Sequence, residues 1–166
     1  MIGIFNKLFQ KNTCTKKVVI QTEVIGFAPE DGNKLVEITA IEIDENDIQT
    51  GAVFHAYINP DCDMLEEVIK IHGLDNEFLH FIAGKEIIGH NVQFDLKFLN
   101  NELGFELQNK ITDTLEMARK VFPNQKNNLN SLCERLDIKI LYSPYNGALL
   151  DALYMLEVYK KLKGGV

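Results

Sequence analysis

Three stretches with the character of β-strands dominate the first third of the chain, and short turns separate them. Val18, Val19 and Ile20 open a strand that we expect to end with Glu23 and to turn at Gly26. Residues 34–44 are dense in β-branched residues, residues 52–58 form a third expected strand closed by Asn59 and Pro60, and turn-forming residues precede each of them. Because short turns join neighbouring strands in opposite directions, these stretches predict an antiparallel meander.

After the meander, the pattern changes to short helices that alternate with short strands. We expect strands over residues 86–88 and 110–112, and helices over 64–71, 76–82, 91–103, 113–121, 128–136 and from 144–147 to about 163. Asn91 is expected to cap the helix that it precedes. A meander followed by this alternation predicts an α/β fold with a mixed sheet flanked by helices.

Length and composition indicate one soluble domain, because the 166 residues are 46% hydrophobic and 25% charged. We expect residues 17–166 to form that domain, and residues 1–16 to be a leader that is either frayed or a short amphipathic helix. The net charge of −7 argues against a broadly basic surface for nucleic acid. The three cysteines lie far apart and no long apolar run occurs, which predicts reduced thiols, a cytoplasmic location and no membrane contact.

Acidic residues in apolar surroundings are the candidates for chemistry. Asp95 follows Phe94, Asp151 lies within the segment ALLDAL, and Glu23 ends the first strand. An unpaired buried carboxylate is costly, and a shared divalent metal ion offsets that cost. Gln21 and Glu23 share one face of their strand, so the first strand offers one acid and one amide. These patterns equally allow each acid to lie at the solvated edge of a helix or near a helix N-terminus.

Seven segments occur in one order along most of the chain: VVIQTEVIG, KLVEITAIEI, IHGLDNEFL, IIGHNVQFDLKFL, ITDTLEMARKVFP, NNLNSLCERLDI and NGALLDALYMLEVY. In these segments the chain resembles the DnaQ-like (DEDDh-type) 3′–5′ exonucleases, and most of all the proofreading (epsilon) subunits of bacterial replicative DNA polymerase. The resemblance implies a ribonuclease H-like mixed sheet flanked by helices. It also implies hydrolysis at the 3′ ends of nucleic acids.

The resemblance further implies a site in which four acids hold two Mg²⁺ or Mn²⁺ ions and a histidine acts as general base. Glu23, Asp95 and Asp151 match the second, third and fourth acids. Gln21 stands at the position of the first acid, and Asn146 stands at the position of the histidine. Substrate contacts are implied at four further residues: Asn91, Phe94, Asn128 and Leu129.

The two replacements predict a degenerate site. The neutral carbonyl oxygen of Gln21 is a poorer ligand than a carboxylate for a hard cation. Asn146 cannot take a proton from water near neutral pH, and loss of a general base costs roughly 10²–10⁴-fold in rate. We therefore expect little or no hydrolysis from a domain kept for binding the 3′ end of a single strand, with a polymerase or another protein as partner.

Other interpretations of these residues remain open. The domain could be an active metal-dependent exonuclease with an atypical site, acting in DNA proofreading or RNA 3′-end trimming, or a purely structural partner. His90 and His72 are the other candidates for a base, although both resemble ordinary family positions. Asn146 is also a good N-cap for the last helix, and Gln21 relieves crowding of like charges. A modest basic cluster, Arg119, Lys120 and Lys126, is either a solvated helix face or a contact for phosphates.

Overall fold

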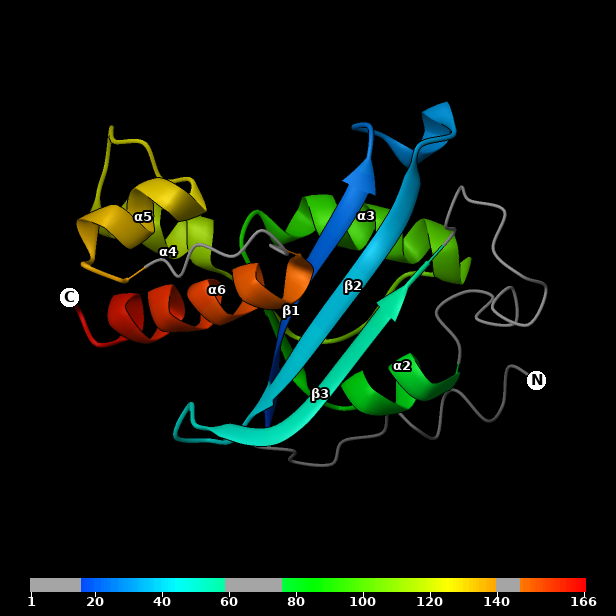
Figure 1. Cartoon of the computed structure of the whole chain (residues 1–166), viewed down its shortest axis with the longest axis horizontal. Coiled ribbons are helices and arrows are strands. Elements are labelled where there is room, and N and C mark those ends of the chain that lie inside the picture. The colour runs from blue at the N-terminus through cyan, green and yellow to red at the C-terminus, as the bar shows by residue number, and fades with distance from the viewer. Residues whose placement is uncertain (1–15, 59–75, 140–146) are drawn as a thin grey trace.

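A mixed sheet with strand order β3-β2-β1-β4-β5 forms the centre of the molecule (Figure 1). The computed structural model describes residues 16–58, 76–139 and 147–166. Its strands are β1 (Lys17–Ile25), β2 (Lys34–Ile43), β3 (Gln49–Tyr57), β4 (Glu86–Gly89) and β5 (Ile111–Asp113). The first three pair antiparallel, whereas β4 and β5 add in parallel. The predicted meander and mixed sheet are therefore confirmed.

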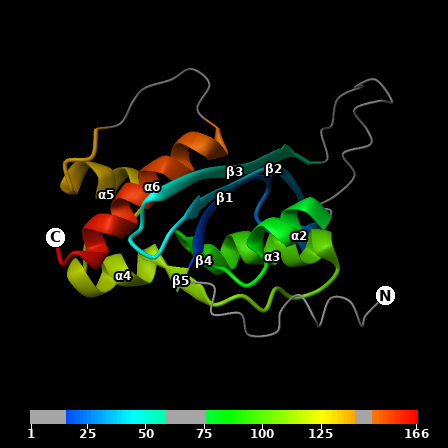
Figure 2. The ribbon, with the colours of Figure 1, turned by 90° about the horizontal axis from the view of Figure 1, so that it is seen from below.

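Helices cover both faces of this sheet. They are the 3-10 turn η1 (Pro29–Asp31) and the helices α2 (Asn76–Ile82), α3 (Val92–Leu103), α4 (Thr114–Val121), α5 (Leu129–Arg135) and α6 (Ala148–Lys163). Figure 2 shows α2 and α3 on one side of the sheet and α6 on the other, with α4 and α5 beside α6. The helix expected over residues 64–71 and the leader at 1–15 lie outside the described residues.

Alternate side chains of β1 pack against different helices, α3 on one face of the sheet and α6 on the other. Ile20 is buried in the core cluster under α3, whereas Val19 is buried with residues of α6 on the opposite face. The pairing of β1 with β2 is regular as far as Glu23. Successive side chains of a strand point to opposite faces, so Gln21 and Glu23 share the α6 face and Thr22 faces α3.

The start of α3 is capped by a residue other than the expected one. Asn91 occupies the N-cap position with φ 57°, in the left-handed region, and its side chain makes no capping hydrogen bond. The Asp113 carboxylate instead accepts the backbone N–H groups of Asn91 and Val92, at 2.9 and 3.2 Å. It also caps its own helix α4 by accepting the N–H of Leu115. The side-chain amide of Asn91 therefore does not cap α3.

The start of α6 also differs from one expectation. Gly147 is the N-cap of this helix, in extended backbone geometry, so the capping role considered for Asn146 does not apply. Asn146 itself lies outside the described residues.

The remaining expectations about the chain concern its cysteines and membranes. Cys133 is a free, buried thiol, and burial raises its pKa to about 11, which keeps it protonated. Cys14 and Cys62 lie outside the described residues. Within the described ranges, no helix has both the length and the apolar character needed to cross a bilayer.

Candidate active site

Two acids face each other where β1 and β2 pair. Glu23 is the cross-strand partner of Glu37, whose side chain is buried. The Oε1 atom of Glu37 lies 2.8 Å from His55 Nε2 on the neighbouring strand β3. A Cβ atom added to Gly147 would lie 3.0 and 3.1 Å from the two Glu37 oxygens, so this carboxylate packs against the start of α6. The sequence patterns do not single out Glu37, because its position opposite Glu23 depends on the strand register.

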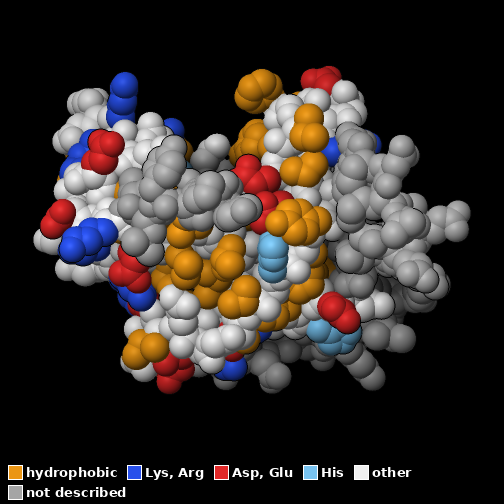
Figure 3. All heavy atoms as spheres, in the orientation of Figure 1, with side chains coloured by type: hydrophobic (Ala, Val, Ile, Leu, Met, Phe, Trp, Pro, Cys, Tyr) orange, Lys and Arg blue, Asp and Glu red, His pale blue; other side chains and the backbone are white. Residues whose placement is uncertain are grey.

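Asp151 completes a group of acids on this face from the first turn of α6. Partial burial raises the pKa of Asp151, and the nearby charge of Glu37 raises it further. Burial likewise raises the pKa of Glu23, with added contributions from the charges of Asp151 and Glu37. Figure 3 shows acidic side chains gathered near the middle of this face, beside a histidine. Glu23, Glu37 and Asp151 are therefore close enough to repel one another, and this repulsion disfavours their ionised forms.

Asp95 approaches β1 from the α3 side. Thr22 Oγ1 donates a hydrogen bond to Asp95 Oδ1, and the Asp95 side chain is buried. Burial raises the pKa of Asp95 to about 7, the charges of Asp113 and Glu23 act in the same direction, and the Thr22 hydrogen bond opposes them. The charge of Glu23 thus acts on the predicted acid Asp95. The Asp95 carboxylate nevertheless accepts its hydrogen bond from Thr22, whose side chain lies on the opposite face of β1 from Glu23.

The described residues do not form a complete set of metal ligands. Across residues 16–58, 76–139 and 147–166, no three His, Cys, Asp or Glu side chains are grouped closely enough to hold an ion. Asp95 Oδ1 accepts a hydrogen bond from Thr22, and Gln21 contributes an amide rather than a carboxylate. Metal binding by Glu23, Asp95 and Asp151 therefore stays a prediction.

A cavity of about 230 Å³, called the central cavity below, lies between β1 and the helices that follow it. Its lining brings together three sequence-predicted residues, Gln21, Asp151 and Asn128, with His90. Leu129 and Asn130 complete the lining. The amide of Gln21 therefore lines the same cavity as an acid and a histidine, in the place where the resemblance implies a carboxylate.

His90 enters this cavity from the turn between β4 and α3. Its Nδ1 atom lies 2.9 Å from Thr114 Oγ1, and that hydroxyl donates to the carbonyl oxygen of Gly89 at 3.0 Å. Burial lowers the pKa of His90, whereas the charge of Asp113 and a hydrogen bond to the Asn127 backbone raise it by a smaller amount. The imidazole is therefore held in place and is neutral near pH 7. Its position in the cavity is not evident from the sequence.

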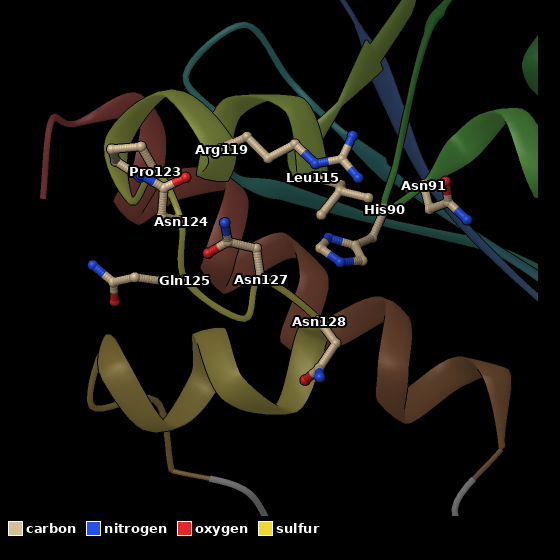
Figure 4. A pocket seen from close by; sticks show the side chains of 9 residues that line it. All are labelled: His90, Asn91, Leu115, Arg119, Pro123, Asn124, Gln125, Asn127 and Asn128. Carbon is tan, nitrogen blue, oxygen red and sulfur yellow. The ribbon is translucent and has the colours of Figure 1, made fainter.

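The other predicted substrate contacts divide between two places. Asn91 is exposed and lines a neighbouring pocket together with Asn128 (Figure 4). Phe94 is partly buried against the core under α3, with its ring centroid 5.2 Å from that of Phe98. Asn91, Asn128 and Leu129 thus gather at the cavities, whereas Phe94 lines neither of them.

Comparison with known proteins places this geometry in a family. The family model described as Exonuclease, of the RNase_T type, matches residues 18–159. The DNA polymerase III subunit epsilon of Rickettsia conorii is 41% identical over 173 residues, covering 90% of this chain and 74% of that protein. The DNA polymerase III subunit epsilon of Escherichia coli is 34% identical over 177 residues, covering 91% and 72%.

Solved structures show the same fold at lower identity. Exonuclease X in complex with 5′ overhanging duplex DNA has a TM-score of 0.60 and 18% identity, over 90% of this chain and 93% of that one. E. coli exonuclease I in complex with a dA16 oligonucleotide has a TM-score of 0.63 and 17% identity, over 90% of this chain and 41% of that one. The expected ribonuclease H-like sheet agrees with these neighbours. The chain belongs to the DnaQ-like 3′–5′ exonuclease family and is similar to its epsilon subunits.

Proposed function

We propose that this domain binds the 3′ end of a single-stranded nucleic acid and hydrolyses it very slowly or not at all. The observation that carries this proposal is the position of Gln21, whose neutral amide lines the central cavity beside Asp151 and His90. In a two-metal mechanism, the metal ions stabilise the attacking and the leaving oxygen together. An amide in place of the bridging acid weakens that stabilisation, because hard divalent cations prefer charged oxygen ligands.

The state of the acids supports weak binding of Mg²⁺ or Mn²⁺. Metal ligands must be deprotonated, and burial raises the pKa of Glu23, Asp95 and Asp151 above their ordinary values. Thr22 donates a hydrogen bond to only one of the two Asp95 oxygens, so the other oxygen would be the one to bind a metal ion. The metal site is therefore degenerate in its ligands, because Gln21 stands in place of an acid.

Binding of a strand end is supported by the polar side chains around the central cavity. Asn91, Asn128 and Leu129 would contact the terminal nucleotides, and Phe94 would support the helix that carries Asp95. The net charge of −7 limits non-specific attraction to phosphates, so recognition of an end fits this chain better than coating of a strand. The relatives are named as subunits of DNA polymerase III, which supports a polymerase as protein partner in the cytoplasm.

The test compares binding with cleavage of a 3′-labelled single-stranded oligonucleotide in the presence of Mg²⁺ or Mn²⁺. We expect the wild type to bind the oligonucleotide and leave its length unchanged. The double variant Gln21→Asp with Asn146→His should shorten it, and Glu23→Gln added to that variant should abolish the gain. Shortening by the wild type at the rate of an active epsilon domain would contradict the proposal. Absence of binding by the wild type would also contradict it.

A second candidate, an active exonuclease with an atypical base, is favoured by one observation. His90 is held in the same cavity as Gln21 and Asp151, where a neutral imidazole could accept a proton from water. If the wild type cleaves, the variant His90→Gln decides this role. A loss of at least tenfold in cleavage with binding unchanged would support His90 as the base. An unchanged rate would exclude it.

A further inference from the structure

Within the described residues, the sheet ends at two edge strands, β3 and β5, which differ in length and charge. β5 has three residues, ends at Asp113 and adjoins Lys110, which pairs with Glu86. β3 has nine residues, QTGAVFHAY, with no Lys, Arg, Asp, Glu or Pro among them. Soluble proteins usually protect an open edge by keeping the strand short or by placing charges or proline on it. Because β3 has none of these protections, its edge is suited to pairing with another strand.

The backbone groups that point away from the sheet are those of Val53, His55 and Tyr57. The N–H of Ile58 donates to the carbonyl oxygen of Val36 on β2 at 2.8 Å. In an antiparallel pair, residues bonded to the neighbouring strand alternate with residues whose N–H and C=O groups point away from it. The pairing with β2 is regular from Tyr57 back to Val53, so every second residue counted back from Ile58 bonds to β2. The residues between them offer their N–H and C=O groups to a further strand.

The side chains of β3 leave one face of this edge apolar and accessible. Val53 is 47% exposed and Tyr57 is 61% exposed. Val53 is the register partner of Ile41, whose side chain is buried with residues of α6, so this is the α6 face, on which Figure 3 shows hydrophobic side chains gathered. On the opposite face, Phe54 packs against α2, with its ring centroid 5.3 Å from that of Phe78. β3 is therefore held from the α2 side, and Val53 and Tyr57 are available for contact.

An irregularity limits the usable part of the edge and fixes how two copies can pair. Gly51 has φ 90°, and the pairing of β3 with β2 shifts between Ile41 and Ile43. The regular part of the edge is therefore residues 53–57, with His55 at its centre. Two identical strands that pair antiparallel are related by a two-fold axis, and residues opposite each other are equally far from that axis. Full pairing of the regular part therefore puts the axis at His55.

This register is complementary in its backbone and in its side chains. Val53 lies opposite Tyr57 of the second copy and His55 lies opposite its own copy, so residues with outward N–H and C=O groups meet, as the hydrogen bonds require. An aromatic side chain opposite a β-branched one is a favourable cross-strand pair, and the axis makes it twice. On the other face, the large Phe54 lies opposite the small Ala56. No Lys, Arg, Asp or Glu meets its like, because β3 has none.

We propose that two copies of this chain associate through their β3 edges and join their sheets into one. A two-fold axis between paired antiparallel strands is perpendicular to the sheet, so the α6 faces of both copies, with their groups of acids, lie on the same side. His55 Nε2 is 2.8 Å from Glu37 Oε1, so the residue at the axis also contacts one of those acids. The inference does not depend on whether the domain cleaves a strand end.

Cysteine cross-linking of the full chain tests the register. Residues opposite each other in a hydrogen-bonded pair have Cα atoms about 5.5 Å apart, which a disulfide can span. Under mild oxidation, His55→Cys should give a disulfide-linked dimer on a non-reducing gel. Val53→Cys alone should not, because position 53 faces position 57, about 13 Å along the strand from position 53 of the other copy. The double variant Val53→Cys with Tyr57→Cys should cross-link again.

Two features of the cross-linking experiment control for unrelated disulfides. All variants are made in a chain with Cys14 and Cys62 replaced by serine, and the buried Cys133 is kept. Ile48→Cys measures cross-linking by random collision, because Ile48 is 62% exposed and stands directly before β3.

Sedimentation velocity at a series of protein concentrations measures the association itself. The wild type should form a dimer whose share rises with concentration. Val53→Lys should weaken association at least about tenfold, because the two-fold axis repeats the lost pair at both ends of the ladder. Ile48→Lys changes the net charge equally and should leave association within about twofold. General repulsion between copies of net charge −7 predicts the opposite sign, since either lysine would reduce it.

Each other outcome overturns the inference. A wild type that stays monomeric at every concentration would do so, as would cross-linking of His55→Cys no faster than that of Ile48→Cys. Cross-linking of Val53→Cys alone at the rate of His55→Cys would place the axis elsewhere. Equal weakening by Ile48→Lys and Val53→Lys would show an association that does not use the β3 edge. Circular dichroism checks that each variant is folded, and Tyr57→Lys, at the other end of the ladder, replaces Val53→Lys if that variant does not fold.

Discussion

Replacing Asp95 by Asn should stabilise the metal-free protein at neutral and alkaline pH. Asp95 is 5% exposed, and burial raises its pKa from 3.8 to about 7. The folded state therefore holds this proton more tightly than the unfolded state, so the stability linked to it is complete below pH 3.8 and is lost as the pH rises to about 7. At 1.36 kcal/mol per pH unit, the loss reaches about 4 kcal/mol. Asparagine avoids the ionisation and still accepts the Thr22 hydrogen bond.

Urea unfolding in the presence of EDTA, at a series of pH values from 4 to 8, measures this effect. The free energy of unfolding of Asp95→Asn should nearly equal that of the wild type at pH 4 and exceed it by up to about 4 kcal/mol at pH 8. Thr22→Val is the companion variant, because it removes the hydrogen bond that opposes the rise in pKa and should steepen the loss of stability with pH. A pH-independent difference, or an Asn variant less stable than the wild type at pH 8, would refute this reasoning.

Three further predictions concern the supports of the site. Asp113→Ala leaves three backbone N–H groups at the starts of α3 and α4 without their acceptor, so chemical denaturation should show a loss of about 2 kcal/mol; an unchanged midpoint would contradict the capping role. Glu37→Gln removes a charge that raises the pKa of Asp151, so an NMR titration should find that pKa lower than in the wild type, and an unmoved value would show the two groups to be uncoupled. Gly147→Ala places a methyl group 3.0 Å from the Glu37 carboxylate and should cost about 1 kcal/mol in thermal unfolding, a cost that must disappear in a Glu37→Ala background.

Most of the sheet could be predicted from local sequence, because β-branched runs flanked by turn residues specify strands. β1 and β2 lie where those runs place them. β3 begins at Gln49 rather than at residue 52, because pairing between Ile43 and Gln49 carries the ladder past an irregularity. That extension depends on a partner strand, so the composition of the segment alone does not reveal it.

The cap of α3 shows a different limit of sequence patterns. Asn91 stands where a helix cap is expected, and its residue type is favourable. The acceptor is nevertheless Asp113, which is 22 positions further along the chain. The parallel pairing of β4 with β5 brings them together, since Gly89 and Asp113 are register partners. Local propensity is overridden by a contact that only the sheet creates.

The candidate site was accessible to sequence patterns in part. The spacing of Gln21 and Glu23 places both on one face, and the structure brings Gln21 and Asp151 to one cavity. Glu37 escapes such patterns, because only the register of β1 and β2 sets it opposite Glu23. The orientation of Asp95 toward Thr22 escapes them as well, since a matching segment fixes which residue is present and leaves its rotamer undetermined.

The rate of cleavage in a single turnover tests the central claim most directly. In two separate reactions, the domain or the Escherichia coli epsilon subunit is added in excess over the same 3′-labelled single strand, with saturating Mg²⁺. Binding and product release then do not limit the rate. Replacement of the general base alone predicts a rate at least about 10²-fold below that of epsilon. A rate within tenfold of epsilon would contradict the account of a degenerate site centred on Gln21.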